Sequence, residues 1–400
     1  MATFLSLDIF PGYGPFSDNG PIQDKTGGLQ MRIMISGGGT GGHTSPAVAI
    51  IEELRKRDPR LVVQWVGRKG GIEQKVAARA GVPFRTVPVE GWPRKRSLRR
   101  LWVAAKLAAG VVRAMLHIAS FRPQAVVGVG GFVCLPLCYA AQRLGILTFL
   151  HEQNKRLGMA NQLLAPRATR LLLSYPETLG RYPADKARVV GNPVRAGFLQ
   201  PPSREDARES LGLDANVPVV LVTGGSQGAH TINAAMKEAV LDFGPRDAQF
   251  LWMTGASDAA SAREAASRSS ARVEVFPFIE DMARACAAAD LMVCRAGASS
   301  TAEIAAMGKP SILIPYPHAT DNHQEQNARA FEQAGAAVVL LDGECTGQRL
   351  AETIRGLLNE PERRAAMAKA AVLLAKPAAA ETIVEEILTH VFQAAPLEEA

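Results

Sequence analysis

The sequence contains few cysteines, and their number is odd. Its 400 residues include five cysteines without C-x-x-C spacing, namely Cys134, Cys138, Cys286, Cys294 and Cys345. This pattern argues against a disulfide framework and against a zinc site. We therefore expect buried, reduced thiols in a cytosolic protein.

Aromatic residues are also scarce, at 6% of the chain, and no motif interleaves them with basic residues for stacking on bases. The net charge of +7 and the pI near 9.3 indicate an anionic partner. The scarcity of aromatic residues argues against nucleic acid as that partner. An acidic membrane surface or a phosphorylated substrate fits the charge instead.

Long apolar runs are absent as well. No uninterrupted run reaches the roughly 18–20 residues of a membrane-spanning helix, so we expect the protein to stay on one side of any membrane. Residues 1–30 lack the basic segment of a signal peptide and include Asp8. Rich in glycine and proline, they are expected to form a disordered leader.

Acidic residues are missing from residues 91–151, which carry several arginines and lysines, including Arg94, Lys95, Arg96, Arg99, Arg100, Lys106 and Arg113. Apolar residues recur among them at nearly helical spacing. One interpretation is an amphipathic helix that packs on the protein with a solvated basic face. The other is that residues 92–100 dock on an anionic membrane surface.

Glycine is concentrated in residues 36–43, which read SGGGTGGH. An apolar run at 31–35 precedes it and predicts a strand, and residues 46–54 predict a helix. Such a turn forms an anion site, because glycines allow close approach and the helix N-terminus favours negative charge. His43 adds a titratable imidazole at the point where the loop enters the helix.

The stretch also matches G-x-G-x-x-G at Gly37, Gly39 and Gly42, a weak signature of dinucleotide binding. The next predicted strand ends in Gly67-Arg68-Lys69, without the carboxylate that would bind the ribose of NAD. NAD is therefore disfavoured, whereas NADP stays open.

The chain alternates predicted strands and helices, and the alternation starts again after Pro201-Pro202. A strand at 217–222 leads into a second glycine loop at 223–229. We predict an α/β protein with two Rossmann-like parallel-sheet domains and a ligand in the cleft between them. The expected division is a leader at 1–30, domains at 31–195 and 196–375, and a final helix and tail at 376–400, with the helix packing back on the N-terminal domain.

Polar clusters follow several predicted strands, at the sheet edge where open α/β folds bind ligands. His151 and Glu152 follow one strand, and residues 296–303 follow another. Glu303 is suited to chelating a ribose diol, although a carboxylate that merely favours the helix N-terminus is the alternative. The amide-rich residues 316–327 are suited to recognising sugar hydroxyls.

Seven motifs occur in an order that resembles the MurG family, the bacterial N-acetylglucosaminyltransferases of peptidoglycan synthesis. They lie at residues 38–43, 151–154, 191–195, 224–229, 278–282, 294–297 and 323–324. The resemblance covers about residues 31 to 395. It implies a GT-B fold and transfer of N-acetylglucosamine from UDP-GlcNAc to the C4 hydroxyl of the muramyl sugar of lipid I, which gives lipid II.

The resemblance also implies roles for individual residues. His43 would be the general base, and Thr40, Gly41, Gly42 and Asn154 would approach the transferred sugar or the acceptor. The nucleotide-sugar contacts would be Arg195, Ser226, Ile279, Ala298, Ser299, Ser300, Thr301, Ala302, Glu303 and Gln324. The expected location is the cytoplasmic face of the bacterial plasma membrane, as a peripheral protein on anionic inner-leaflet lipid.

The chemistry of the residues agrees with this reaction. An inverting transfer needs a base near the acceptor hydroxyl, and an imidazole is suited to that role. Helix N-termini and Arg195 can stabilise the departing UDP, and no D-x-D motif is present, so we expect neither a metal nor another cofactor.

Three alternatives stay open on the sequence alone. The first is another GT-B enzyme that uses a UDP-sugar, such as a diacylglycerol glycosyltransferase or a UDP-GlcNAc epimerase. An NADP-dependent oxidoreductase would use the glycine motif, but leaves Glu303 without a role. A non-catalytic protein that binds a nucleotide-sugar is the third alternative.

Overall fold

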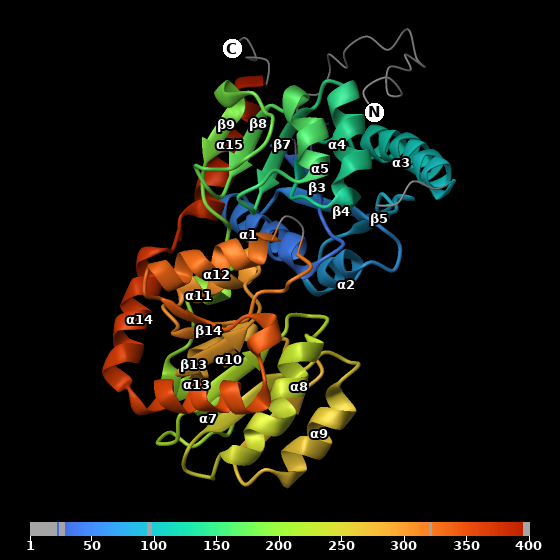
Figure 1. Ribbon diagram of the computed structural model, residues 1–400. Coiled ribbons are helices and arrows are strands. Elements are labelled where there is room, and N and C mark those ends of the chain that lie inside the picture. The colour runs from blue at the N-terminus through green and yellow to red at the C-terminus, as the bar shows by residue number, and fades with distance from the viewer. Residues whose placement is uncertain (1–21, 24–28, 94–97, 320–321, 395–400) are drawn as a thin grey trace.

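The chain forms two α/β domains, one above the other in Figure 1. The computed structural model describes residues 22–23, 29–93, 98–319 and 322–394. Each domain is built on one parallel sheet, with seven strands in the first and six in the second. The predicted pair of Rossmann-like domains is therefore confirmed.

The N-terminal sheet has the order β5-β4-β3-β6-β7-β8-β9. Its strands are β3 (Arg32–Ser36), β4 (Val62–Gly67), β5 (Phe84–Thr86), β6 (Ala125–Gly128), β7 (Leu147–Glu152), β8 (Arg170–Leu173) and β9 (Ala187–Val189). The central strands are continuous apolar runs because helices cover both faces of the sheet. The order reverses direction beside β3, so the loops after β3 and β6 lie next to each other, where open sheets bind ligands.

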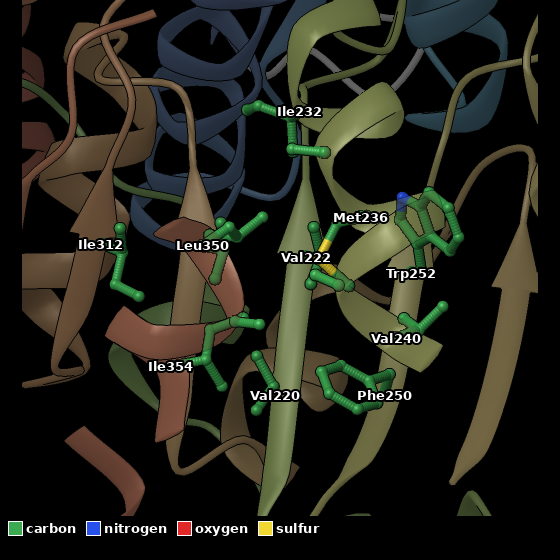
Figure 2. Packing of buried hydrophobic residues seen from close by; sticks show 14 of the residues in the cluster. Val220, Val222, Ile232, Met236, Val240, Phe250, Trp252, Ile312, Leu350 and Ile354 are labelled. Atoms are coloured by element: carbon green, nitrogen blue, oxygen red, sulfur yellow. The ribbon is translucent and has the colours of Figure 1, made fainter. Parts of the chain in front are cut away.

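The C-terminal sheet has the order β12-β11-β10-β13-β14-β15. Its strands are β10 (Val219–Thr223), β11 (Gln249–Met253), β12 (Arg272–Phe276), β13 (Leu291–Cys294), β14 (Ser311–Leu313) and β15 (Ala337–Val339). Figure 2 shows one face of this sheet, where Val220, Val222 and Trp252 meet apolar side chains from two helices.

Helices alternate with these strands. In the N-terminal domain they are α1 (Gly41–Arg57), α2 (Ile72–Arg79), α3 (Arg99–Phe121), α4 (Leu135–Arg143) and α5 (Met159–Leu164). The following helices are α6 (Ala196–Leu199), α7 (Arg204–Ser210), α8 (His230–Ala239), α9 (Ala259–Arg268), α10 (Met282–Ala288), α11 (Ala298–Ala306), α12 (His323–Gln333), α13 (Gly347–Asn359), α14 (Pro361–Leu373) and α15 (Ala379–Ala394).

The last helix returns to the first domain (Figure 1). On α15, Ile383, Val384 and Ile387 are fully buried in the core that also contains Ile50 of α1 and Phe149 of β7. The end of the chain therefore stabilises the N-terminal domain.

Two short strands lie within the expected leader. Strands β1 (Ile22–Gln23) and β2 (Leu29–Gln30) pair in antiparallel fashion, and the disorder expected for residues 1–30 stays a prediction. Residues 1–21 and 24–28 lie outside the described residues.

Helix α3 bears on the expectation drawn from apolar runs by its length and composition alone. Lys106 and Arg113 interrupt its apolar sequence, yet among the described residues it is long and apolar enough to cross a membrane, with a mean hydropathy of 1.5. Only one stripe is buried, at Val103, Gly110 and Ala114 among others, and the helix packs against α4. The opposite faces are left uncovered in this structure.

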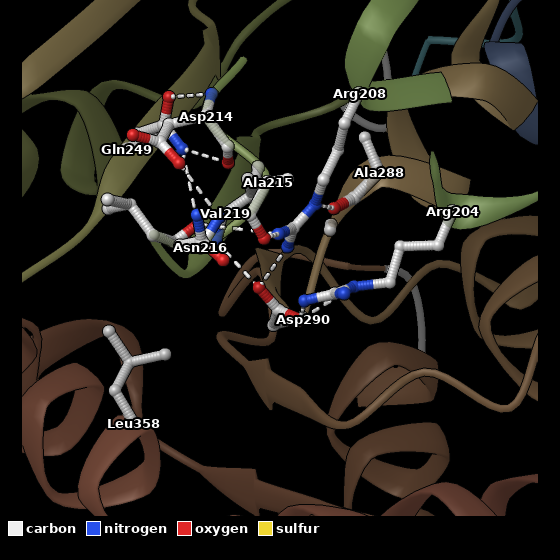
Figure 3. A network of polar contacts seen from close by, with 12 residues as sticks. Arg204, Arg208, Asp214, Ala215, Asn216, Val219, Gln249, Ala288, Asp290 and Leu358 are labelled. Atoms are coloured by element: carbon white, nitrogen blue, oxygen red, sulfur yellow. Dashed lines mark hydrogen bonds and ion pairs between the residues drawn. The ribbon is translucent and has the colours of Figure 1, made fainter. Parts of the chain in front are cut away.

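Buried polar groups fix the start of the second domain (Figure 3). Arg208 of α7 is 2% exposed and pairs with Asp290, whose carboxylate also accepts a hydrogen bond of 2.7 Å from the N–H of Val219. Burial raises the pKa of Asp290, but this hydrogen bond and the nearby arginines outweigh it and lower the pKa overall. Gln249 makes a second buried network nearby, with the backbone of Asp214 and Val217.

Candidate active site

The first glycine loop connects β3 to α1 and leaves the helix start open. Thr40 precedes the helix in an extended conformation, with φ −143°, and makes no side-chain cap. The first turn of α1 therefore offers N–H groups to a ligand. Glycine is required at Gly39, where φ is +84°, and at Gly37, where a Cβ would lie 2.0 Å from Val129 Cγ2.

A carboxylate supports this loop from behind. Glu73, on α2, is fully buried and accepts hydrogen bonds from the N–H of Gly39 at 3.2 Å and of Arg68 at 2.9 Å. A Cβ on Gly38 would lie 2.5 Å from Glu73 Oε2, so the loop packs tightly on the carboxylate. The motifs did not include Glu73, for which the only signal in the sequence was an acid in the first turn after Gly70-Gly71.

His43 lies in the first turn of α1 and is half-buried. Its Nδ1 lies 3.0 Å from Oε1 of Gln153. Burial lowers the pKa of His43, although the charge of Glu152 and the bond to Gln153 oppose the shift. His323, at the start of α12, lowers this pKa further. The imidazole is therefore neutral near pH 7, as a general base must be.

Gln153 links His43 to a second, fully buried imidazole. Its Nε2 donates to the carbonyl of Val129 at 2.8 Å and lies 2.9 Å from Nδ1 of His151. The other ring nitrogen of His151 lies 3.0 Å from the carbonyl of Gly191. Burial lowers the pKa of His151 to about 4.

Glu152 organises the segment that carries Asn154. It is 2% exposed and accepts hydrogen bonds from both the N–H and the side-chain amide of Asn154, at 3.1 and 3.0 Å. The N–H of Gly158 and the amide of Asn161 bind its other oxygen at 2.8 and 3.0 Å. Glu152 thus acts as a structural anchor, and Asn154 is held beside the residue that contacts His43.

The second domain presents the start of α11 to the start of α1. Ser299 Oγ donates to the carbonyl of Gly42 at 3.0 Å. Glu303 Oε1 accepts from Ser45 Oγ at 2.9 Å and from Nη2 of Arg195 at 3.0 Å. Two helix starts from different domains therefore face each other, and four predicted residues from three stretches of the sequence meet there.

The second glycine loop adjoins the same region. A Cβ placed on Gly41 would lie 3.4 Å from Ser226 Oγ, so this loop approaches the start of α1. Gly228, with φ +77°, must be glycine because a Cβ would lie 2.0 Å from the carbonyl oxygen of Thr254. Arg195 stacks over the ring of Phe198, with 4.7 Å from Cζ to the ring centroid.

The other predicted contacts have local partners. The N–H of Ile279 approaches Sδ of Met253 at 3.2 Å, and Oε1 of Gln324 accepts from the N–H of Tyr316 at 3.0 Å. Thr301 is 2% exposed, and its hydroxyl donates back to carbonyls of the same helix start. The remaining predicted positions of α11 are the buried Ala298 and the half-buried Ser300 and Ala302.

The described ranges contain no cluster of side chains suited to a metal ion. No three His, Cys, Asp or Glu side chains gather there as an ion would require. The expectation of metal-independent chemistry stays a prediction.

Known proteins resemble this chain along nearly its whole length. Residues 33–173 match the glycosyltransferase family 28 N-terminal domain, and residues 219–383 match the glycosyltransferase family 28 C-terminal domain. A relative from Halalkalibacterium halodurans is 40% identical over 355 residues, covering 88% of this chain and 98% of the relative. It is named UDP-N-acetylglucosamine–N-acetylmuramyl-(pentapeptide) pyrophosphoryl-undecaprenol N-acetylglucosamine transferase, as is a Desulforudis audaxviator relative, 40% identical over 89% of this chain and 98% of its own.

Solved structures share the fold. The crystal structure of Acinetobacter baumannii MurG has a TM-score of 0.69 and 27% identity, and the match covers 90% of this chain and 99% of that one. A UDP-GlcNAc 2-epimerase from Neisseria meningitidis, bound to UDP-GlcNAc, has a TM-score of 0.62 at 15% identity, covering 90% of this chain and 100% of the other. At that identity the epimerase shares the architecture alone.

Proposed function

This chain belongs to the MurG family of glycosyltransferase family 28, and we propose that it converts lipid I to lipid II with UDP-GlcNAc as the donor. The family resemblance, the GT-B fold and the assignment as an N-acetylglucosaminyltransferase, all predicted from the sequence, are confirmed by these likenesses. The roles of individual residues in the transfer are part of the proposal.

One observation carries the assignment of roles: His43 and Glu303 come from different domains, and the α1 and α11 helix starts that carry them are in contact. A general base on the N-terminal domain and a nucleotide-sugar-binding residue on the C-terminal domain suit a transfer between two substrates. Holding two reactants in one geometry lowers the entropic part of the barrier.

His43 takes the proton of the C4 hydroxyl of the muramyl sugar in the proposed reaction. The C4 oxygen then attacks the anomeric carbon of GlcNAc from the side opposite UDP, and the bond to UDP breaks, which inverts the configuration. The lowered pKa of His43 favours this role, because the ring is already unprotonated when the acceptor binds.

The departing UDP gains negative charge, for which the structure offers two stabilising groups. The start of α11, at Gly297 in an extended conformation, has no side-chain cap and can donate N–H groups to phosphate. Arg195 supplies a cation, 31% exposed and adjacent to Glu303. The carboxylate of Glu303 would then accept the two ribose hydroxyls.

Membrane docking is the second part of the proposal, and α3 supports it. Leu98, Leu101, Trp102 and Leu116 are between 61% and 85% exposed. Lys106 lies over the ring of Trp102, with Nζ 5.8 Å from the ring centroid, as lysines do beside interfacial tryptophans. Arg94, Lys95 and Arg96, part of the predicted docking segment, lie outside the described residues.

A carboxylate pairs with two of the described basic residues of this surface. Glu90, which precedes the acid-free segment, pairs with Arg99 at 2.5 Å and with Lys106 at 2.9 Å. These two hydrogen bonds lower the pKa of Glu90 to about 2. We therefore expect the exposed apolar side chains of α3 to contribute to binding alongside charge, on the cytoplasmic face where the lipid-linked acceptor resides.

Docking is tested with vesicles of phosphatidylglycerol and a double variant, Leu101→Ser with Trp102→Ser. Losing two interfacial side chains should weaken sedimentation with the vesicles by at least about tenfold. Leu373→Ser, at an 84% exposed leucine of α14 in the other domain, is the matched control and should bind normally. Equal binding by the double variant and the wild type would contradict docking through α3.

The reaction itself is tested by transfer of labelled GlcNAc from UDP-GlcNAc to a lipid I analogue with EDTA present. A product with a new β-linkage supports an inverting, metal-independent transferase. Tight UDP binding without transfer would leave the fold intact and exclude this acceptor. Conversion of UDP-GlcNAc without an acceptor would favour an epimerase instead.

A further inference from the structure

We propose that Gln153 is a positioning residue which, backed by His151, holds His43 in the tautomer with its proton on Nδ1 and a free lone pair on Nε2. This inference rests on the proposed role of His43 as the base and adds the groups that prepare it. Two backbone carbonyls, those of Gly191 and Val129, determine which atoms of His151 and Gln153 donate and which accept. The orientation of Gln153 then determines the tautomer of His43.

The first fixed point is the carbonyl of Gly191, which can only accept. His151 Nε2 lies 3.0 Å from it, so this nitrogen carries the proton of the neutral ring. His151 is fully buried with a pKa of about 4, and it is therefore neutral at physiological pH. Its Nδ1 is left as an acceptor.

The second fixed point is the carbonyl of Val129, again only an acceptor. It lies 2.8 Å from Nε2 of Gln153, which sets the orientation of this amide. The second hydrogen of the same nitrogen donates to Nδ1 of His151 at 2.9 Å. Both hydrogens of Gln153 Nε2 are thus hydrogen-bonded, and the two backbone carbonyls are consistent with the same orientation of the Gln153 amide.

The remaining atom of the amide, Oε1, can only accept a hydrogen bond. It lies 3.0 Å from Nδ1 of His43, which must therefore be the protonated nitrogen. The lone pair is on Nε2, where a base can take a proton. The reverse tautomer would place two acceptors against each other at this distance.

A glycine turn keeps the imidazole against Gln153. Gly130 and Gly131 adopt φ values of +90° and +75°, and a Cβ on Gly130 would lie 2.8 Å from His43 Nδ1. No side chain fits between this turn and the ring. The glycine turn that follows β6 therefore closes around the proposed base.

The charged and titratable groups that affect His43 come from two other elements. Glu152 and His151 are on β7, and His323 begins α12. The first turn of α1 contains no acid, and Gly130 and Gly131 carry no charge. The hydrogen bond that His43 donates to Gln153 raises the pKa of His43 against the larger effect of burial.

Nitrogen-15 NMR of the full-length wild type, with labelled histidine, tests the tautomer directly and without any activity measurement. Long-range proton–nitrogen spectra near pH 8 should show His43 protonated on Nδ1 and bare on Nε2, with the signal assigned by its loss in His43→Gln. A proton on Nε2 of His43 would overturn the proposal.

Two substitutions test the role of Gln153 in the transfer reaction. Gln153→Met removes the acceptor, so kcat should fall at least about tenfold and the acidic limb of the kcat/KM profile should move to lower pH. Gln153→Glu keeps an acceptor and adds a charge, so this limb should move to higher pH while the proton stays on Nδ1. Opposite shifts are not expected from mere loss of structure.

The matched control is Gln249→Met in the other domain. Gln249 is 2% exposed, as is Gln153, and it too makes three hydrogen bonds with its side chain (Figure 3). It should lose thermal stability without moving the pH profile or the His43 tautomer. A Gln153→Met variant that matches this control in both readouts would overturn the positioning role. Full transfer by His43→Ala would refute the proposed base while leaving the measured tautomer valid, so the two failures are distinguishable.

Discussion

The two halves of the active site differ in how their principal side chains are held. His43 contacts Gln153 from its own domain, and that amide is fixed by the carbonyl of Val129 and the ring of His151. Glu303 is held by Ser45 from the opposite domain and by Arg195 from the segment between the domains. The proposed base is therefore preorganised inside one domain, whereas the proposed ribose ligand, Glu303, would have to exchange partners when UDP-GlcNAc binds.

This difference predicts that substitutions in the two halves change different kinetic constants. Damage at His43 should lower kcat, because the proton transfer occurs in the transition state. Damage at Glu303 should raise KM for UDP-GlcNAc, because the ribose is bound in ground state and transition state alike.

The largest effect is expected for His43→Ala. Loss of a general base should reduce kcat by roughly 10²–10⁴-fold while UDP still raises the melting temperature as in the wild type. His230→Ala is the control, since the side chain of His230 is 84% exposed. A His43→Ala variant with wild-type turnover would remove this residue from the mechanism.

The next effect concerns pH and the buried His151. Its pKa is about 4 in the folded protein, compared with about 6.5 for a free histidine, so the unfolded chain binds the extra proton. This contribution to stability is complete above pH 6.5 and is lost as the pH falls towards 4, by about 2–3 kcal/mol at pH 4.5.

Urea unfolding between pH 7 and 4.5 measures this loss, with His151→Gln as the comparison. The variant lacks the titrating ring and should show a shallower fall in unfolding free energy over this range. An identical slope in both proteins would argue against a buried neutral His151 as the source.

Glu303→Ala tests the proposed nucleotide-sugar-binding half of the site. A hydrogen-bonded charge contributes about 1.5–3 kcal/mol, so KM for UDP-GlcNAc should rise at least about tenfold with a smaller change in kcat. Glu352→Ala, at an exposed carboxylate of α13, is the control. An unchanged KM would exclude ribose binding by Glu303.

The smallest effect sharpens the comparison, because it has the opposite sign. Ser45→Ala removes a partner that competes for Glu303, so KM for UDP-GlcNAc should fall by up to about fivefold. Ser210→Ala, whose hydroxyl bonds within its own helix, should leave KM unchanged. A raised KM in Ser45→Ala would mean that Ser45 assists donor binding.

The sequence by itself determined the architecture and most of the candidate site. Alternating apolar runs and helices specify parallel sheets, because both faces of each sheet are buried. The glycine loops and the polar residues at strand ends were recognisable because their chemistry is local: a positive φ, a free helix start, a titratable ring.

Only the tertiary structure decided which of these residues meet. The sequence could not place Glu73 behind the first loop or Ser45 against Glu303, since both depend on the packing of helices far apart in the chain. Nor could it specify the tautomer of His43, which depends on carbonyls of Val129 and Gly191 brought to one point by the sheet. Local sequence patterns indicate the backbone conformation that a segment prefers. Contacts between distant segments form only when the helices and sheets pack into a common core.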